Sequence, residues 1–153
     1  MRPLFVLLFS LSTLLYGCGD GAFYSKSYEF KDKKWSQQQK PRFVIDFQDT
    51  TKLYDFRIAL RTTTDYKFNN LWIFLHSKPP YGESVREPYE IKTTYPDGRW
   101  IGKKSGSIVE HQLIFKRRRP PYKGKYVFEI EQGISEKIID EVLDISFIVE
   151  ETK

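Results

Sequence analysis

Hydrophobic and polar residues alternate along much of the chain after residue 42. In residues 43–47 every second residue is Phe or Ile, and in residues 54–61 every second residue is apolar. This period of two is typical of strands with one buried face. The two runs are separated by Gln-Asp-Thr-Thr at 48–51, which is typical of a turn, so we expect them to form a hairpin. The residues expected to share the buried face of the second run are Tyr54, Phe56, Ile58 and Leu60.

Further segments have patterns typical of strands. Residues 71–75 are five consecutive apolar residues within 70–76, which predicts a central strand covered on both faces. The other predicted strands are 89–95, 108–116, 125–131 and 144–150, with a short extended piece at 99–102. Loops are predicted at 78–88 and 103–107, and a turn at Pro96-Asp97-Gly98.

Only residues 134–142 have a helical period. Ile134, Ile138 and Val142 are spaced four apart, and Ser135 is a suitable N-cap. About eight strands with Gly or Pro turns between them predict an all-β fold. We therefore expect an antiparallel β-sandwich, Ig-like or jelly-roll-like, with one short helix near the C-terminus.

The N-terminus resembles that of a lipoprotein precursor. Arg2 precedes an apolar stretch at residues 4–16, which is shorter than the ~20 residues of a membrane span and suits a signal peptide. The sequence Leu-Tyr-Gly-Cys at 15–18 resembles a lipobox, in which cleavage precedes a cysteine that receives lipid. The alternative is a free cysteine after an ordinary signal peptide. We expect lipid attachment at Cys18, because the single cysteine of the chain falls at this position.

The domain organisation follows from this N-terminus. Residues 1–17 are predicted as a lipoprotein signal peptide, 18–26 as a lipidated tether and 27–153 as a single β-sandwich domain. The chain contains no repeat, low-complexity tract or interdomain linker that would divide the last segment.

Composition excludes several classes of protein. A hydrophobic content of 40% and an aromatic content of 16% exclude disorder. One cysteine excludes a disulfide framework and a thiolate metal cage. The two histidines, His76 and His111, have no ligand partner at a chelating spacing, and no nucleophile elbow or phosphate-binding loop is present. We expect no enzyme activity, no metal and no cofactor.

One run of basic residues stands out from an otherwise mildly basic chain of net charge +5. It lies between two predicted strands and contains two prolines, which cannot donate ladder hydrogen bonds. The run is either a solvated loop or a contact site for lipid headgroups or an acidic partner. A nucleic-acid partner is not expected for an envelope protein. The candidate contact residues are Lys116, Arg117, Arg118, Arg119 and Lys123.

Aromatic residues are more numerous than one small core needs. Core and cross-strand packing accounts for most of them. Those beside predicted loops are candidates for an exposed stacking surface against a glycan or a partner. These candidates are Tyr81, Tyr95, Trp100 and Tyr122.

Four segments carry a resemblance to a known family. They are Asn-Leu-Trp-Ile-Phe-Leu at 70–75, Asp-Gly-Arg-Trp-Ile-Gly at 97–102, Gly-Lys-Tyr-Val-Phe-Glu-Ile-Glu-Gln at 124–132 and Val-Leu-Asp-Ile-Ser-Phe-Ile-Val-Glu at 142–150. With the lipobox and this length, the chain resembles the gliding motility lipoprotein family GldH of Bacteroidetes, over roughly residues 35–150. It departs from the family pattern at 133–136, where Gly-Ile-Ser-Glu replaces the usual Met-Arg pair.

The resemblance implies an envelope lipoprotein of the gliding motility and type IX secretion-associated machinery. We expect the lipid anchor to lie in the outer membrane rather than the inner. Our leading hypothesis is a non-catalytic binding or assembly component whose partners are other envelope proteins. The alternatives are a carbohydrate-binding envelope lipoprotein and a hydrolase with a non-local site.

Overall fold

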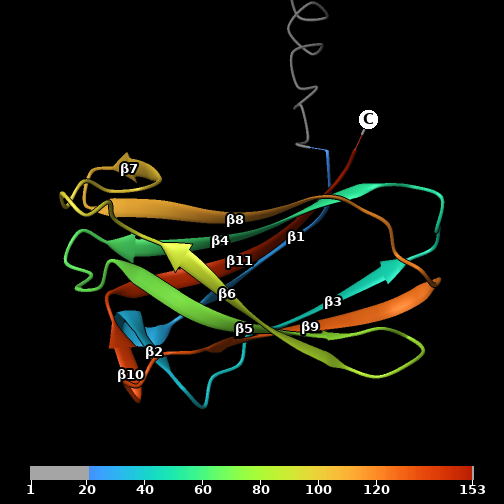
Figure 1. The fold of residues 1–153 in the computed structure, drawn as a ribbon, viewed down its shortest axis with the longest axis horizontal. Coiled ribbons are helices and arrows are strands. Elements are labelled where there is room, and N and C mark those ends of the chain that lie inside the picture. The colour runs from blue at the N-terminus through green and yellow to red at the C-terminus, as the bar shows by residue number, and fades with distance from the viewer. Residues whose placement is uncertain (1–20, 153) are drawn as a thin grey trace, which may run out of the picture.

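Two antiparallel β-sheets lie face to face in the computed structural model, which describes residues 21–152 (Figure 1). The first sheet has the order β1 (Ala22–Glu29), β11 (Val142–Glu151), β4 (Tyr54–Thr63), β8 (Ile108–Arg118) and β7 (Lys103–Ser105). The second has the order β3 (Arg42–Phe47), β9 (Gly124–Gln132), β5 (Asn70–Lys78) and β6 (Val85–Lys92). A small ribbon of β2 (Lys34–Ser36) and β10 (Ile138–Asp140) lies at one end, after the 3-10 turn η1 (Lys31–Lys33). The all-β, sandwich-like prediction is confirmed.

The predicted signal peptide at 1–17 and Cys18 lie outside the described residues. Residues 22–26, predicted as part of the tether, instead lie in β1 and pair with β11. No helix within 21–152 is long and apolar enough to cross a membrane.

The core fills the space between the two sheets, as the alternating patterns predict. Phe43, Ile45 and Phe47 of β3 are buried while the residues between them are exposed. Ile58 and Leu60 of β4 are fully buried on the facing sheet. Their inward direction confirms the face predicted for residues 54–60, since side chains two apart along a strand share a face.

Strand β5 is interior to its sheet but is covered on only one face. It lies between β9 and β6, and its inward residues Leu71, Ile73 and Leu75 are buried. On the outer face Trp72 is 42% exposed, and the Arg86 guanidinium lies 3.4 Å from the centre of the Phe74 ring. The prediction of a strand covered on both faces is therefore wrong for the outer face.

The hairpin predicted between residues 43–47 and 54–61 is wrong. Strand β3 pairs with β9, whereas β4 pairs with β11 and β8 in the other sheet. The intervening segment crosses from one layer to the other at the right-hand end of Figure 1. Alternation determines which face of a strand is buried, but it does not determine the strand's partner.

The helix predicted at 134–142 is also wrong. Ile138 is 50% exposed and its neighbour Ile139 is 1% exposed in the short strand β10, the reverse of the burial that a helix with Ile138 inward requires. Glu141, with φ of 66°, separates β10 from β11. The preceding loop is held by Gln132, whose side-chain amide donates to the carbonyl of Glu136. The apolar residues Ile134, Ile138 and Val142 are spaced four apart as in a helix, but here Ile138 lies in β10 and Val142 begins β11. Spacing by four therefore does not by itself show a helix.

Two predicted loops contain strands. Strand β6 begins at Val85 and includes Pro88, which an edge strand tolerates because its free N–H side needs no partner. Strand β7 occupies 103–105 and pairs with the start of β8. The polar and charged residues at the start of β6 and the three-residue length of β7 gave little strand signal.

We predict that Ile58→Ala lowers the free energy of unfolding by about 2–5 kcal/mol, because Ile58 is fully buried and its truncation leaves a cavity. The matched control is Ile114→Ala on β8, where the side chain is exposed and the loss should stay within about 0.5–1 kcal/mol. Chemical denaturation measures both. Equal losses for the two variants would contradict the register of β4 and β8.

Candidate functional site

Three connecting segments meet at one end of the sandwich, which we call the basic end. They are 48–53, 79–84 and 119–123, at the right of Figure 1. The strand register of the first sheet places the start of β1 at the level of the basic end. Ala22 of β1 pairs with Glu150 of β11. The next residue, Glu151, pairs with Tyr54 of β4, which in turn pairs with Arg118 of β8. The chain therefore enters the described domain at the level of the basic end.

A β-bulge sets the direction of the basic residues at the end of β8. Phe56 pairs with Phe115 and Tyr54 pairs with Arg118, so one residue of β4 opposes two residues of β8. Within the bulge, Arg117 has φ of 53° and its backbone N–H donates to Asp55 Oδ1 at 2.7 Å. The extra residue reverses the alternation. Arg118 consequently faces inward with Tyr54, where simple alternation from Phe115 would turn it outward.

The rest of the basic run is held in place by its own contacts. The Tyr126 hydroxyl accepts the backbone N–H of Tyr122 at 3.0 Å and donates to its carbonyl at 3.1 Å. Pro120 is buried, and Gly124 has φ of 123° beside Pro80. The loop therefore presents its charges from a constrained backbone.

The five basic residues predicted as a contact site all have exposed side chains and all lie in or beside this loop. Within the described part of the chain none of them forms an ion pair, whereas other surface cations such as Lys52 and Arg57 do. The group comprises Lys116, Arg117, Arg118, Arg119 and Lys123. Unpaired cations retain their full charge for an external anion.

The structure divides the predicted aromatic candidates between the two ends. Tyr81 and Tyr122 meet at the basic end, with ring centres 5.8 Å apart and planes at 78°, and both are exposed. Tyr95 lies in the turn before β7, at the opposite end, with the Arg99 guanidinium 5.2 Å from its ring centre. Trp100 is half-buried there against His111. No three of these rings form a flat row.

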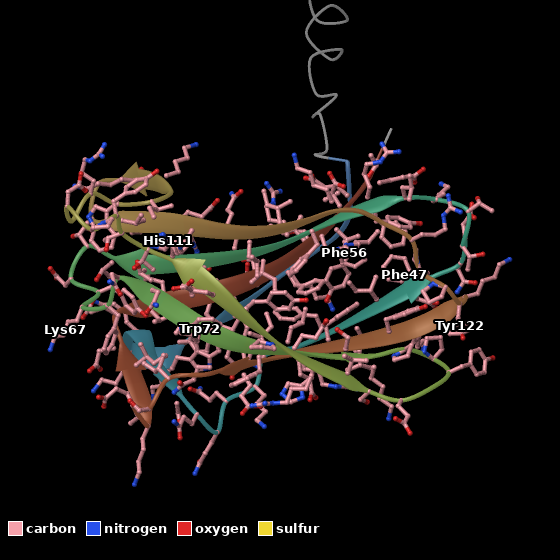
Figure 2. All side chains as sticks on the ribbon, viewed as in Figure 1. Phe47, Phe56, Lys67, Trp72, His111 and Tyr122 are labelled. Carbon is pink, nitrogen blue, oxygen red and sulfur yellow. The ribbon has the colours of Figure 1, made fainter. Side chains whose placement is uncertain are left out.

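A cavity opens between the sheets next to the basic end. It has a volume of about 430 Å³ and is lined mainly by aromatic and aliphatic side chains. Its lining residues are Phe56, Leu75, Ser77, Glu87, Tyr89, Phe115, Arg118, Pro121, Phe128 and Phe147. Figure 2 shows Phe56 and Phe47 pointing into the space between the sheets and Tyr122 at the outer end. A second cavity of about 240 Å³ shares five of these residues and adds Arg119 and Tyr126.

Sequence patterns did not reveal this cavity. Its walls come from six strands, and its charged residue Arg118 faces inward only because of the bulge. A positive φ at a non-glycine residue cannot be read from alternation. The one available signal was the excess of Phe and Tyr, which does not say where the rings gather.

The histidines have structural partners. His111 is buried, with Nδ1 2.5 Å from the carbonyl of Ile101 and Nε2 3.2 Å from the Thr62 hydroxyl. Burial lowers the pKa of His111, which favours the neutral ring. His76 Nε2 lies 2.7 Å from Glu131 Oε2 on the outer face of the second sheet.

The Glu131 carboxylate lies beside the side chains of His76, Lys40 and Arg86. Partial burial raises the pKa of its carboxyl, but hydrogen bonds from His76 and Lys40 outweigh that effect and bring the pKa below its usual value. Among residues 21–152 no three His, Cys, Asp or Glu side chains gather in a way that would hold a metal ion.

Comparison with known proteins gives a consistent match. The model of the GldH lipoprotein family matches residues 22–149. The chain is 29% identical over 163 residues to the gliding motility lipoprotein GldH homolog of Christiangramia forsetii, covering 99% of each chain. It is 26% identical over 152 residues to the gliding motility lipoprotein GldH of Flavobacterium johnsoniae, covering 95% of this chain and 94% of the relative.

Among solved structures, a chain from the infectious bursal disease virus Gx strain aligns with 84% of this chain and 32% of its own length. The sequence identity is 10% and the TM-score is 0.36.

We predict that Arg117→Gly is more stable than Arg117→Ala by about 1 kcal/mol, because an L side chain at φ of 53° pays a steric cost that glycine avoids. Both variants remove the same charge, so each controls for the other. Urea denaturation measures the difference. A glycine variant less stable than the alanine variant would show that residue 117 is not left-handed in solution.

Proposed function

This chain belongs to the GldH lipoprotein family, and on that basis we propose that it is a lipid-anchored envelope protein that binds other proteins of a gliding motility machinery. Its role is non-catalytic, in binding or assembly, and the machinery includes components associated with type IX secretion. The relatives are named as gliding motility lipoproteins, which supports gliding motility as the process. The observation that carries the binding role is the set of unpaired cations on the constrained loop of the basic end.

The position of the anchor supports the basic end as the contact surface. Cys18 precedes Ala22 by four residues, so the lipidated cysteine lies within ~14 Å of the start of β1 even if the chain is fully extended. Arg118 lies three strands away from Ala22 along the same row, or about 14 Å at the usual strand spacing. The cations are thereby held close to the membrane surface, where an acidic partner in the envelope can reach them.

The aromatic arrangement favours a protein partner over a glycan. Sugar rings stack on exposed, roughly coplanar aromatic faces, and Tyr81 and Tyr122 meet at 78° instead. Tyr95 and Trp100 lie at the far end and cannot extend that pair. An edge-to-face tyrosine pair beside unpaired arginines is typical of protein interfaces, in which Tyr and Arg are enriched.

We propose the outer membrane as the site of anchoring, with Cys18 as the residue that carries the lipid. Two or three acyl chains bind a bilayer nearly irreversibly, since each buried methylene contributes ~0.8 kcal/mol. One cysteine in the whole chain also leaves no second thiol for an envelope disulfide.

Cys18→Ala should abolish incorporation of an alkyne-labelled fatty acid and leave the protein with its signal peptide uncleaved. Cys18→Ser serves as a second variant that keeps the size of the side chain. Click labelling and intact mass of the wild type and both variants measure the outcome. A wild-type protein without label, or a variant with label, would refute attachment at Cys18.

Replacing Lys116, Arg117 and Lys123 together by Gln should weaken recovery of partner proteins from the native envelope by at least tenfold, because three exposed cations leave the basic end. None of these three lines the cavities. Quantitative mass spectrometry after affinity purification measures the recovery, with raised salt reproducing the loss in the wild type.

The matched control replaces Lys67, Lys103 and Lys104 by Gln. These three lysines are equally exposed but lie at the opposite end, where Figure 2 labels Lys67. Recovery should be unchanged. If both triple variants retain every partner, or both lose them equally, the basic end is not the contact surface.

A further inference from the structure

The cavity between the sheets is a second feature of the basic end, and it differs in chemistry from the basic loop. Its deep walls are the rings of Phe56, Phe128 and Phe147 with Leu75. The Tyr89 and Phe115 rings, 4.9 Å apart and nearly perpendicular, connect β6 with β8 along one side. A volume of about 430 Å³ is within the usual range for small-molecule sites, ~300–1,000 Å³.

Polar groups in the cavity are few and lie mostly at its margin. Glu87 is the single carboxylate among the described lining residues, and it accepts a hydrogen bond from the Tyr89 hydroxyl at 3.1 Å. Ser77 contributes one hydroxyl. In the second cavity the Tyr126 hydroxyl is already engaged by the backbone of Tyr122. A ligand rich in hydrogen-bonding groups would leave many of them unpaired here.

Two arginines give this margin a net positive charge. Arg118 lines both cavities and Arg119 lines the smaller one. Neither forms an ion pair within the described residues, so Glu87 does not neutralise them at contact distance. The bulge at Arg117 turns Arg118 toward the cavity, and Asp55 holds the bulge through the backbone N–H of Arg117. An apolar space with guanidinium groups at its edge is complementary to an apolar chain that ends in an anion.

We propose that this cavity binds a single-chain amphipathic anion of the fatty-acid type. The alkyl chain lies among the phenylalanine rings between the two sheets, and the carboxylate accepts hydrogen bonds from Arg118, with Arg119 close by. The site adjoins the protein-binding surface proposed above and shares Arg118 and Arg119 with it, whereas Lys116, Arg117 and Lys123 line neither cavity.

An alkyl chain fits this space better than an extended peptide does. Every peptide residue brings an N–H and a C=O that need partners when buried, and the deep walls offer rings and aliphatic groups only. An alkyl chain brings no such groups, and its burial is favourable in proportion to the apolar area removed from water. A sugar is disfavoured for the same reason as a peptide.

Photo-crosslinking tests the proposal on the full lipidated chain in zwitterionic phosphatidylcholine vesicles. The probe is a twelve-carbon fatty acid with a diazirine near the end of its chain, and the matched probe is the corresponding fatty alcohol. Peptide mapping should locate adducts of the acid on the segments that contain Phe56, Phe115 or Phe128. Excess unlabelled dodecanoate should suppress these adducts, and dodecyltrimethylammonium should not.

Two variants test recognition of the carboxylate and recognition of the alkyl chain separately. Arg118→Gln should reduce labelling by the acid about tenfold, which corresponds to the loss of one charge-assisted hydrogen bond, and should leave labelling by the alcohol unchanged. Ser77→Leu should prevent labelling by both probes, because the larger side chain occupies space that Ser77 leaves open to both cavities. Arg99→Gln, at the opposite end, is the control and should label as the wild type does.

The thermal midpoint shows whether each variant is folded. Ser77→Leu should keep or raise the midpoint, since it fills an apolar cavity. Equal labelling of the wild type and folded Ser77→Leu, or adducts confined to other segments, would overturn the proposal. So would equal labelling by the acid in the wild type and Arg118→Gln, because the anionic head would then have no role. Crosslinking of an acidic, apolar peptide from another protein into the cavity, with no labelling by either probe, would assign the site to a protein partner instead.

Discussion

Stacking of phenylalanine rings across the two sheets is the interaction on which the fold depends. Phe147 of β11 faces Phe128 of β9 with ring centres 4.9 Å apart and Phe43 of β3 at 5.4 Å. Both contacts join one sheet to the other, and Phe147 is also adjacent to Phe56 of its own sheet. Rings of this size fill the gap between facing sheets, so they set both its width and its depth. The contact of Phe43 with Phe147 is non-local, because β3 and β11 lie near opposite ends of the described chain.

The same rings explain why a cavity lies next to the basic end. At that end Phe47, Tyr54 and Tyr126 continue the ring packing on one side. On the other side the cavity is lined by Ser77, Arg118 and Pro121, which do not continue it. The bulge determines which arginine lines the cavity, because simple alternation from Phe115 would turn Arg117 inward and the extra residue turns Arg118 inward instead. The pairing of β4 with β8 continues on both sides of the bulge.

The chain belongs to the GldH lipoprotein family, whose named relatives are gliding motility lipoproteins. The geometry of the domain adds candidate contact surfaces. The four short segments that carry the family resemblance lie in β5, in the turn before β7, in β9 and in β11. Surface charge, the position of β1 and the inter-sheet space are the observations that support the proposed molecular role. All three lie at the basic end, at the level where β1 begins.

The sequence by itself determined several of the long strands and their buried faces, as residues 43–47, 54–60, 125–131 and 144–150 illustrate, because a period of two follows directly from strand geometry. It also predicted a lipobox and located the basic run, since both are contiguous in the sequence. It could not determine that β3 and β4 lie in opposite sheets, because pairing depends on contacts between distant segments. The helical spacing of Ile134, Ile138 and Val142 misled for the same reason, since the partner of β10 is β2, about a hundred residues earlier. Only the tertiary structure decided that Arg118 faces the cavity, because a one-residue bulge changes the direction of a side chain without leaving a pattern in the sequence.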